Sequence, residues 1–174
     1  MCVSDAPFNF LGRIEVGDLS WPTDMVADDK RGCLYISDRY GRYGVGQPAQ
    51  PRLIVLYVDD SHTVFPMDIT PGGLSLLGDG RLMVVCENKK IDRCLRLYRF
   101  SSNEDAAVTV DPAFEEIPLQ SERYVLQAAM IRESVDDPKD TRIVMSQEHK
   151  SAKVHRIICV NGLGEEVSDW LQVT

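Results

Sequence analysis

Histidine and cysteine are the residue types in this chain that most readily bind a metal or attack an electrophile. Zinc sites use regularly spaced His and Cys ligands, whereas the nearest histidine pair, His149 and His155, lies in the irregular stretch QEHKSAKVHR. The cysteines contain no CxxC pair and follow no regular spacing: Cys2, Cys33, Cys86, Cys94 and Cys159. We therefore predict no metal site. We interpret Cys33, Cys86 and Cys159, in or beside apolar runs, as buried thiols of a reducing compartment.

The sequence also lacks the local motifs of nucleophilic, phosphate-binding and zinc-protease chemistry. It contains no GxSxG, P-loop, GxGxxG or HExxH. The stretch DDSH (59–62) combines carboxylates, a hydroxyl and an imidazole, but a triad needs convergence in space that adjacency does not supply. We interpret it as a polar turn. The sequence thus predicts no catalytic residue, no cofactor and no enzymatic activity.

Short apolar runs dominate the chain and predict β-strands. They are rich in Val, Ile, Leu and Tyr and cover residues 34–37, 52–58, 81–86, 95–100, 142–146 and 155–160. Turn segments rich in Asp, Asn and Gly separate many of them, at 28–32, 78–80, 136–140 and 161–164. Helical periodicity is nearly absent. The pattern therefore predicts an all-β antiparallel protein.

The strands recur in a repeated order. WPTDMVADDKRGCLYISD (21–38) and TPGGLSLLGDGRLMVVCE (70–87) each run from a proline through an apolar stretch and a turn into a strand. A third, more degraded copy aligns when Leu34, Leu82 and Ile143 are superposed. Units of about 40–50 residues with several strands are typical of β-propeller blades. A β-sandwich of generic hairpins is the alternative.

We therefore predict an incomplete β-propeller of about three four-stranded antiparallel blades in a single unit. The unit spans 8–174, with blades at approximately 21–66, 70–117 and 125–170. The phrase FNFLGRIE (8–15) is interpreted as an outermost strand. Three blades cannot close a ring, because propellers have about four to eight. The chain is therefore expected either to be a piece of a longer ring or to complete one by self-association.

The repeat resembles an NHL repeat. The matching elements of the first copy are Pro22, the 28–32 turn, the strand ending at Asp38 and the phrase RLIVLY (52–57). The second copy matches at Pro71, the 78–80 turn and the Arg96–Phe100 strand, but has Cys86 and Glu87 where the family usually has Asp. The third copy lacks the proline and has Gln147 at its strand end.

This resemblance implies an NHL-like propeller that acts as a scaffold for protein binding, as part of a larger protein of the tripartite-motif class. Ubiquitin-ligase activity in such a protein would lie in a RING domain, which this chain lacks. Stacked blades would place the loops after each second strand on one rim. The partner-binding residues predicted there are Arg39, Tyr40, Tyr43, Lys89, Lys90, Arg93, His149 and Lys150.

Two alternative functions also follow from the resemblance. NHL domains of the tripartite-motif class bind RNA through a positive rim, so an RNA-binding module is the first. Related propeller hydrolases and lyases hold a metal at the channel mouth, where Asp38, Glu87 and Asn88 would lie here, so a metal-dependent enzyme is the second. The histidine ligands of the lyases have no counterpart in the first two copies.

The net charge and the hydropathy of the chain indicate which kinds of partner and which location to expect. The formal net charge of −8 over 174 residues repels phosphate backbones in general. No apolar run approaches the roughly 18 residues of a membrane span, and the N-terminus lacks the basic and apolar regions of a signal peptide. The expected location is therefore the cytoplasm, with no membrane partner.

Overall fold

The computed structural model describes residues 19–41, 50–87, 93–102, 108–119, 124–148 and 155–173. Of residues 40–41, 101–102, 108–113, 124 and 168–173 it describes the backbone alone. Within these ranges the chain forms twelve strands and one short 3-10 helix, η1 (Pro138–Asp140). The prediction of an all-β antiparallel protein is confirmed. The expected strand at 8–15 lies outside the described residues.

The strands form three separate four-stranded antiparallel sheets, each made of strands consecutive in sequence. Sheet A contains β1 (Pro22–Asp28), β2 (Cys33–Gly41), β3 (Gln50–Tyr57) and β4 (His62–Pro66). Sheet B contains β5 (Thr70–Leu76), β6 (Leu82–Glu87), β7 (Arg93–Ser102) and β8 (Val108–Leu119). Sheet C contains β9 (Tyr124–Arg132), β10 (Arg142–Glu148), β11 (His155–Val160) and β12 (Glu166–Val173).

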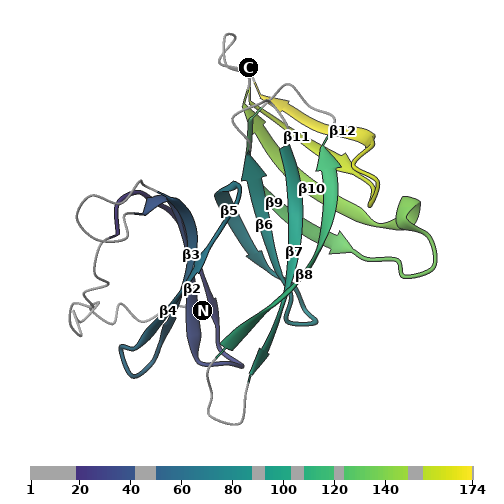
Figure 1. The fold of residues 1–174 in the computed structure, drawn as a ribbon. Helices are drawn as coiled ribbons and strands as arrows, with labels where there is room; N and C mark the ends of the chain where they lie inside the picture. Colours follow the sequence, from purple (N-terminus) through teal and green to yellow (C-terminus); the bar gives the residue numbers. More distant parts are fainter. Residues whose placement is uncertain are drawn as a thin grey trace, which may run out of the picture.

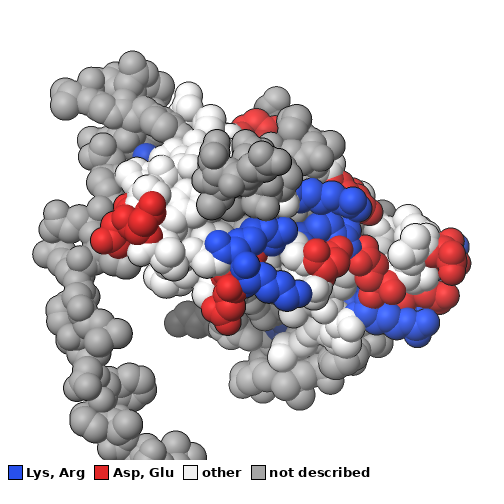
Figure 2. All heavy atoms as spheres, turned by 90° about the horizontal axis from the view of Figure 1, so that it is seen from below, with Lys and Arg blue, Asp and Glu red and all other residues white. Residues whose placement is uncertain are grey.

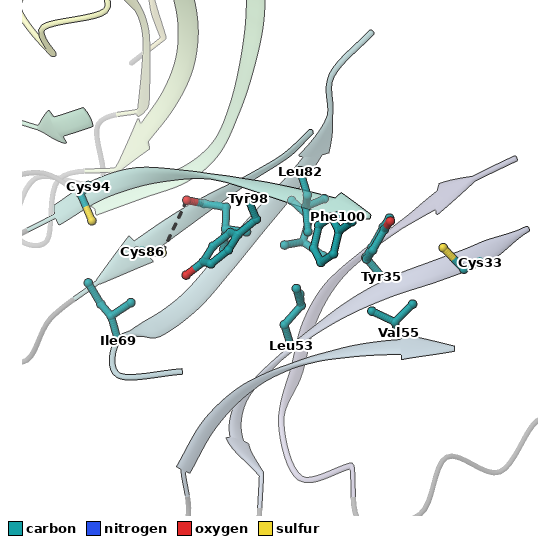
Figure 3. Close-up of a cluster of buried hydrophobic side chains, with 12 residues drawn as sticks. Cys33, Tyr35, Leu53, Val55, Ile69, Leu82, Cys86, Cys94, Tyr98 and Phe100 are labelled. Atoms are coloured by element: carbon teal, nitrogen blue, oxygen red, sulfur yellow. Dashed lines mark hydrogen bonds between the residues drawn. The ribbon is translucent and has the colours of Figure 1, made fainter. Parts of the chain in front are cut away.

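The sheets stack face to face in the order A, B, C, and the apolar core lies between them (Figure 1). One cluster joins sheets A and B, with the Tyr35 and Phe100 rings 4.8 Å apart at its centre (Figure 3). A second joins sheets B and C through side chains such as Leu95 and Ile143. A third, around Ile54, lies on the face of sheet A that points away from sheet B. Each sheet is therefore stabilised by burial against a neighbour, because small isolated sheets are marginal in water.

The continuous apolar runs in the sequence correspond to strands buried on both faces. In β6, Leu82 and Val84 pack toward sheet A, while Met83 and Val85 pack toward sheet C. Since successive side chains point to opposite faces, a strand between two sheets needs apolar residues at every position. Strand β10 instead alternates buried and half-buried residues, because sheet C packs on sheet B through one face.

The alignment of the three copies is confirmed by the register of the strands. Leu82 packs toward sheet A, Ile143 toward sheet B, and Leu34 on the corresponding face of sheet A. Pro22 opens β1, Pro71 is the second residue of β5, and the four predicted turn segments contain the turns. DDSH (59–62) lies at the predicted turn, with Asp59 and Asp60 in the turn itself.

The arginines that matched the NHL phrase in the first two copies, Arg52 and Arg96, do not occupy equivalent positions in the sheets. The arginine of the first copy's third strand, Arg52, pairs with Asp38. At the equivalent place in sheet B, Cys94 pairs with Cys86, and Arg96 lies two residues further along β7. Arg96 thus faces sheet A from the middle of its strand, where its guanidinium binds Asp68 and Glu116. Sequence matching alone could not resolve this shift, because Cys94 and Arg96 lie only two residues apart in the same strand.

Polar contacts tie sheets A and B together at both ends of their strands. The Ser37 hydroxyl donates a hydrogen bond to the Gly72 carbonyl at 2.8 Å. At the opposite end, Arg31 donates to Asp28 at 2.6 Å and to the carbonyls of Gly80 and Phe100 at 3.0 and 3.2 Å. These contacts fix the relative positions of the two sheets and of the turns that connect their strands.

Candidate functional site

The predicted binding rim lies where the second strand of each sheet ends. Of its residues, Arg39 and Arg93 are described with their side chains, and Tyr40 is described by its backbone in β2. The remaining predicted contact residues lie outside the described residues: Tyr43, Lys89, Lys90, His149 and Lys150. Arg39 and Arg93 therefore represent the predicted rim within the described part of the chain.

Both arginines bind the same carboxylate. Arg39 of sheet A contacts Glu87 of sheet B at 2.8 Å, and Arg93 contacts the other oxygen of Glu87 at 3.5 Å. The Arg39 and Glu87 side chains are each about a third exposed, whereas that of Arg93 is buried. Glu87 thus offsets one of the two positive charges, which weakens the electrostatic case for phosphate binding at this place.

A hollow among the described residues lies at the opposite end of the strands, between sheets B and C. We call it the B–C groove; its volume is 490 Å³. Leu97, Ile117 and Met130 supply apolar side chains from both sheets. The β9–β10 connection and the β11–β12 turn complete the lining, where the Gly162 amide donates to the Pro138 carbonyl at 2.8 Å. Both connecting segments are therefore held against each other beside the groove.

A buried arginine organises the polar wall of the B–C groove. The Arg81 guanidinium binds Asp79 at 2.5 Å, Glu133 in the β9–β10 connection, and Glu115 of β8 at 3.6 Å. Its side chain is 7% exposed, while that of Glu115 is 64% exposed. Burial alone would raise the pKa of Asp79, but its hydrogen bonds from Arg81 outweigh that effect and lower the pKa below its ordinary value. Arg81 therefore links the β5–β6 turn and β8 of sheet B to the β9–β10 connection of sheet C.

Arg99 also lines the groove but takes no part in this network. It is exposed on β7, and no described residue forms a hydrogen bond or ion pair with its guanidinium. The groove therefore combines three carboxylates with two guanidiniums, one of them already bound to those carboxylates. The apolar floor of the groove, formed by Leu97, Ile117 and Met130, thus lies beside a wall with a surplus of negative charge. This arrangement is better suited to binding a partner than to proton-transfer catalysis.

Sequence reasoning missed the B–C groove. GDGR (78–81) predicted a turn, which is correct, but gave no sign that Arg81 meets Glu133, 52 residues later. The available signal was an arginine directly after an Asp-Gly turn, where its side chain must lie at the end of a sheet. The partner across the sheets could not be found without knowing how sheets B and C stack.

The face of the molecule seen from below in Figure 1 carries charges of both signs. Figure 2 shows Lys and Arg side chains interleaved with Asp and Glu side chains across it, without a wide area of one sign. Within the ranges that the structure describes, no three His, Cys, Asp or Glu side chains gather as metal ligands would. None of the helical segments in those ranges is long and apolar enough to cross a bilayer.

The predicted burial of three thiols is confirmed. Cys33, Cys86 and Cys159 are buried, and so is Cys94.

Comparisons of the chain with protein-family models, with curated proteins and with solved structures give no match. The resemblance to NHL repeats therefore stays a prediction.

Proposed function

We propose that this chain is a non-enzymatic protein-interaction module, and that the B–C groove binds an extended segment of a partner protein. The observation that carries this proposal is the pairing of an apolar floor with a charged wall already fixed by Arg81. Ligand sites are typically hollows of about 300–1,000 Å³ with a few well-placed polar groups. A wall that is ordered before binding reduces the entropy lost on association.

The charges of the groove favour a particular partner segment. Asp79, Glu115 and Glu133 outnumber the arginines of the groove, and Glu115 is largely exposed. A Lys or Arg side chain of the partner would complement these carboxylates. Apolar side chains next to it would cover Leu97 and Ile117. The segment we propose is therefore basic and apolar in alternation, bound in an extended conformation.

The architecture we propose is part of an NHL-like propeller in the cytoplasm. Three sheets of consecutive strands stack face to face, and the first strands β1, β5 and β9 are joined by hydrogen bonds through one carboxylate, that of Asp24. This arrangement supports blades arranged around an axis. The buried free thiols support a reducing compartment. A ligase activity would belong to a RING domain elsewhere in a longer protein.

Completion of the ring requires a further sheet from the rest of a longer protein or from a second copy. The face of sheet C that points away from sheet B carries Val144 and Ile157, both half-buried, and Ile131, which is 57% exposed. We expect the isolated chain to self-associate through such surfaces, because water disfavours exposed apolar area. Light scattering measures the mass; a cooperatively folded monomer would contradict this part of the proposal.

Selection from a displayed library of random peptides tests the proposed function. The bait is the purified full chain, and the enriched peptides are then titrated against variants. Glu115→Lys reverses a charge at the wall, and Val135→Lys adds a charge at a 94% exposed position in the groove lining. Val58→Lys is the matched control, since Val58 is 88% exposed in the β3–β4 turn, outside the groove.

We expect peptides with a basic residue flanked by apolar ones, bound at least tenfold more weakly by both groove variants and equally by Val58→Lys. The groove is not the binding site if the library yields no binder, or if the selected peptides bind both groove variants as tightly as wild type.

A gel-shift titration with RNA at low salt, where phosphate contacts are strongest, tests the RNA alternative. Elemental analysis of the purified protein tests the metal-dependent alternative, for which stoichiometric zinc or calcium would be required.

A further inference from the structure

Two cysteines face each other across neighbouring strands of sheet B. Cys86 in β6 and Cys94 in β7 are directly paired in the antiparallel register. Both belong to the apolar cluster between sheets A and B, where Cys86 is fully buried and Cys94 is 5% exposed (Figure 3). Both are free thiols. Directly paired residues have Cα atoms about 4.5–5.5 Å apart, within the range of about 4.4–6.8 Å that a disulfide spans.

The same place in the other two sheets holds a polar link between the second and third strands. In sheet A, Arg52 contacts Asp38 at 2.9 Å, and the two residues are directly paired. In sheet C, Arg156 donates a hydrogen bond to the Gln147 side chain at 3.1 Å, and these two are paired as well. The strands are thus joined through side chains at this point in every sheet, and sheet B alone of the three uses groups that can form a covalent bond.

We propose that Cys86 and Cys94 form a redox-active dithiol, which hydrogen peroxide or a similar small peroxide converts to a cross-strand disulfide. The Cys94 thiolate attacks a peroxide oxygen, the O–O bond breaks, and one water leaves as Cys94 becomes a sulfenic acid. The Cys86 sulfur then attacks the Cys94 sulfur, and a second water leaves. Two thiols lose two protons and two electrons, and one peroxide is reduced to two waters.

The surroundings of the two thiols assign their roles. The hydrogen bond with Cys86 lowers the pKa of the Cys94 thiol, and burial raises the pKa of the Cys86 thiol well above its ordinary value. The thiolate is the nucleophilic form, and Cys94 is also the more accessible of the two. Cys94 therefore reacts with the peroxide, and Cys86, already beside it, resolves the intermediate.

The disulfide would fix the ends of the segment that connects β6 and β7. Glu87 and Arg93 are the next directly paired residues in the register, and Glu87 binds Arg39 of sheet A. Oxidation would therefore restrain the rim where sheets A and B meet. This inference is independent of the B–C groove, which lies at the other end of the strands.

Peptide mapping of the reduced, folded chain after exposure to hydrogen peroxide tests the proposal. Remaining thiols are alkylated with iodoacetamide under denaturing conditions before digestion with trypsin. Trypsin cleaves after Lys89, Lys90 and Arg93, so a disulfide would join the peptides LMVVCENK (82–89) and CLR (94–96). We expect this linked pair as the main product, and alkylation of the whole chain to fall from five sites to three.

The variant Cys86→Ala separates the two steps. Without the resolving thiol, Cys94 is expected to stop at the sulfenic acid, which dimedone labels. Cys33→Ala is the matched control, since Cys33 lies in the same cluster but on sheet A, and it should leave the linked pair intact. The proposal is overturned if folded wild-type chain keeps five alkylated sites, or if the linked peptides appear only after unfolding in urea. If Cys86→Ala does not fold, the wild-type map decides alone.

Discussion

The side-chain amide of Gln127 donates a hydrogen bond of 2.8 Å to the carboxylate of Asp24, 103 residues earlier in the chain. The same carboxylate oxygen accepts a hydrogen bond of 2.8 Å from the backbone amide of Leu74. Asp24 lies in β1, Leu74 in β5 and Gln127 in β9. One carboxylate therefore connects the first strands of all three sheets, and it determines how closely these strands approach one another.

Replacement of this carboxylate is expected to destabilise the whole stack. Asp24→Ala removes the acceptor of Leu74 and Gln127, and hydrogen bonds to charged groups contribute about 1.5–3 kcal/mol each. Because Asp24 is half-buried, we expect a loss of about 1–3 kcal/mol in the free energy of unfolding, measured by urea titration. Asp29→Ala, at an exposed position of the β1–β2 turn, should change it by less than about 0.5 kcal/mol. Equal effects of the two variants would contradict the role of Asp24.

Gly73 allows β5 and β9 to lie close together. A Cβ atom at this position would lie 2.6 Å from the Leu126 carbonyl oxygen and 2.0 Å from the Gln127 side-chain oxygen. The glutamine can move, but the backbone carbonyl cannot without shifting β9. Gly73→Ala is therefore expected to cost about 1–3 kcal/mol, as overpacking does.

The matched control for this substitution is Gly78→Ala. A Cβ atom at Gly78 meets no atom within 4 Å, so the change is expected to lie within about 0.5 kcal/mol of wild type. Thermal unfolding of the two variants side by side checks the prediction. A Gly73→Ala protein as stable as Gly78→Ala would mean that the strands are not held at this separation.

The buried ion pair of sheet A can be tested by comparing a single variant with a double variant. Asp38 and Arg52 are fully or almost fully buried, and the Asp38 carboxylate also accepts the backbone amide of Trp21 at 2.8 Å. Asp38→Ala leaves the Arg52 charge buried without this carboxylate, which typically costs about 3–5 kcal/mol. The double variant Asp38→Ala/Arg52→Leu removes that charge as well and is expected to be more stable than Asp38→Ala. Urea titration compares the two; a double variant that is no more stable would contradict the prediction.

Acid is expected to weaken the contact between Asp68 and Arg96. The hydrogen bond from Arg96, at 3.2 Å to one Asp68 oxygen, lowers the pKa of Asp68 below its ordinary value. A carboxyl whose pKa is lower in the folded protein than in the unfolded chain stabilises the fold. The stabilisation is fully present above the pKa of the unfolded chain, about 3.9, and is lost as the pH falls through the pKa of the folded protein.

Urea titrations between neutral pH and about pH 2 measure this contribution. We expect Asp68→Asn to be less stable than wild type at neutral pH and to converge toward it below about pH 4. The difference should be small, because Asp68 is largely exposed and its attraction to Arg96 is screened by water. Unfolding free energies that differ by a constant amount at every pH would contradict the assignment.

The amino-acid sequence by itself determined the strands, the turns and the repeat. Leu34, Leu82 and Ile143 could be aligned because strand and turn preferences are local, and because a repeated unit needs the same apolar positions each time. The burial of Cys33, Cys86 and Cys159 followed from their apolar neighbours for the same reason. Of the predicted rim, Arg39 and Arg93 share Glu87, which the sequence had suggested only as a metal ligand of the alternative enzymatic function.

The tertiary structure alone decided which side chains of different sheets meet. Arg81 with Glu133, and Asp24 with Gln127, are separated by 52 and 103 residues, and no local pattern encodes such distances. The pairing of Cys86 with Cys94 likewise required the register of β6 and β7, because a slip of one residue turns every side chain to the other face. Hydrogen-bond register and sheet stacking are long-range properties, and they are what creates the B–C groove and the dithiol.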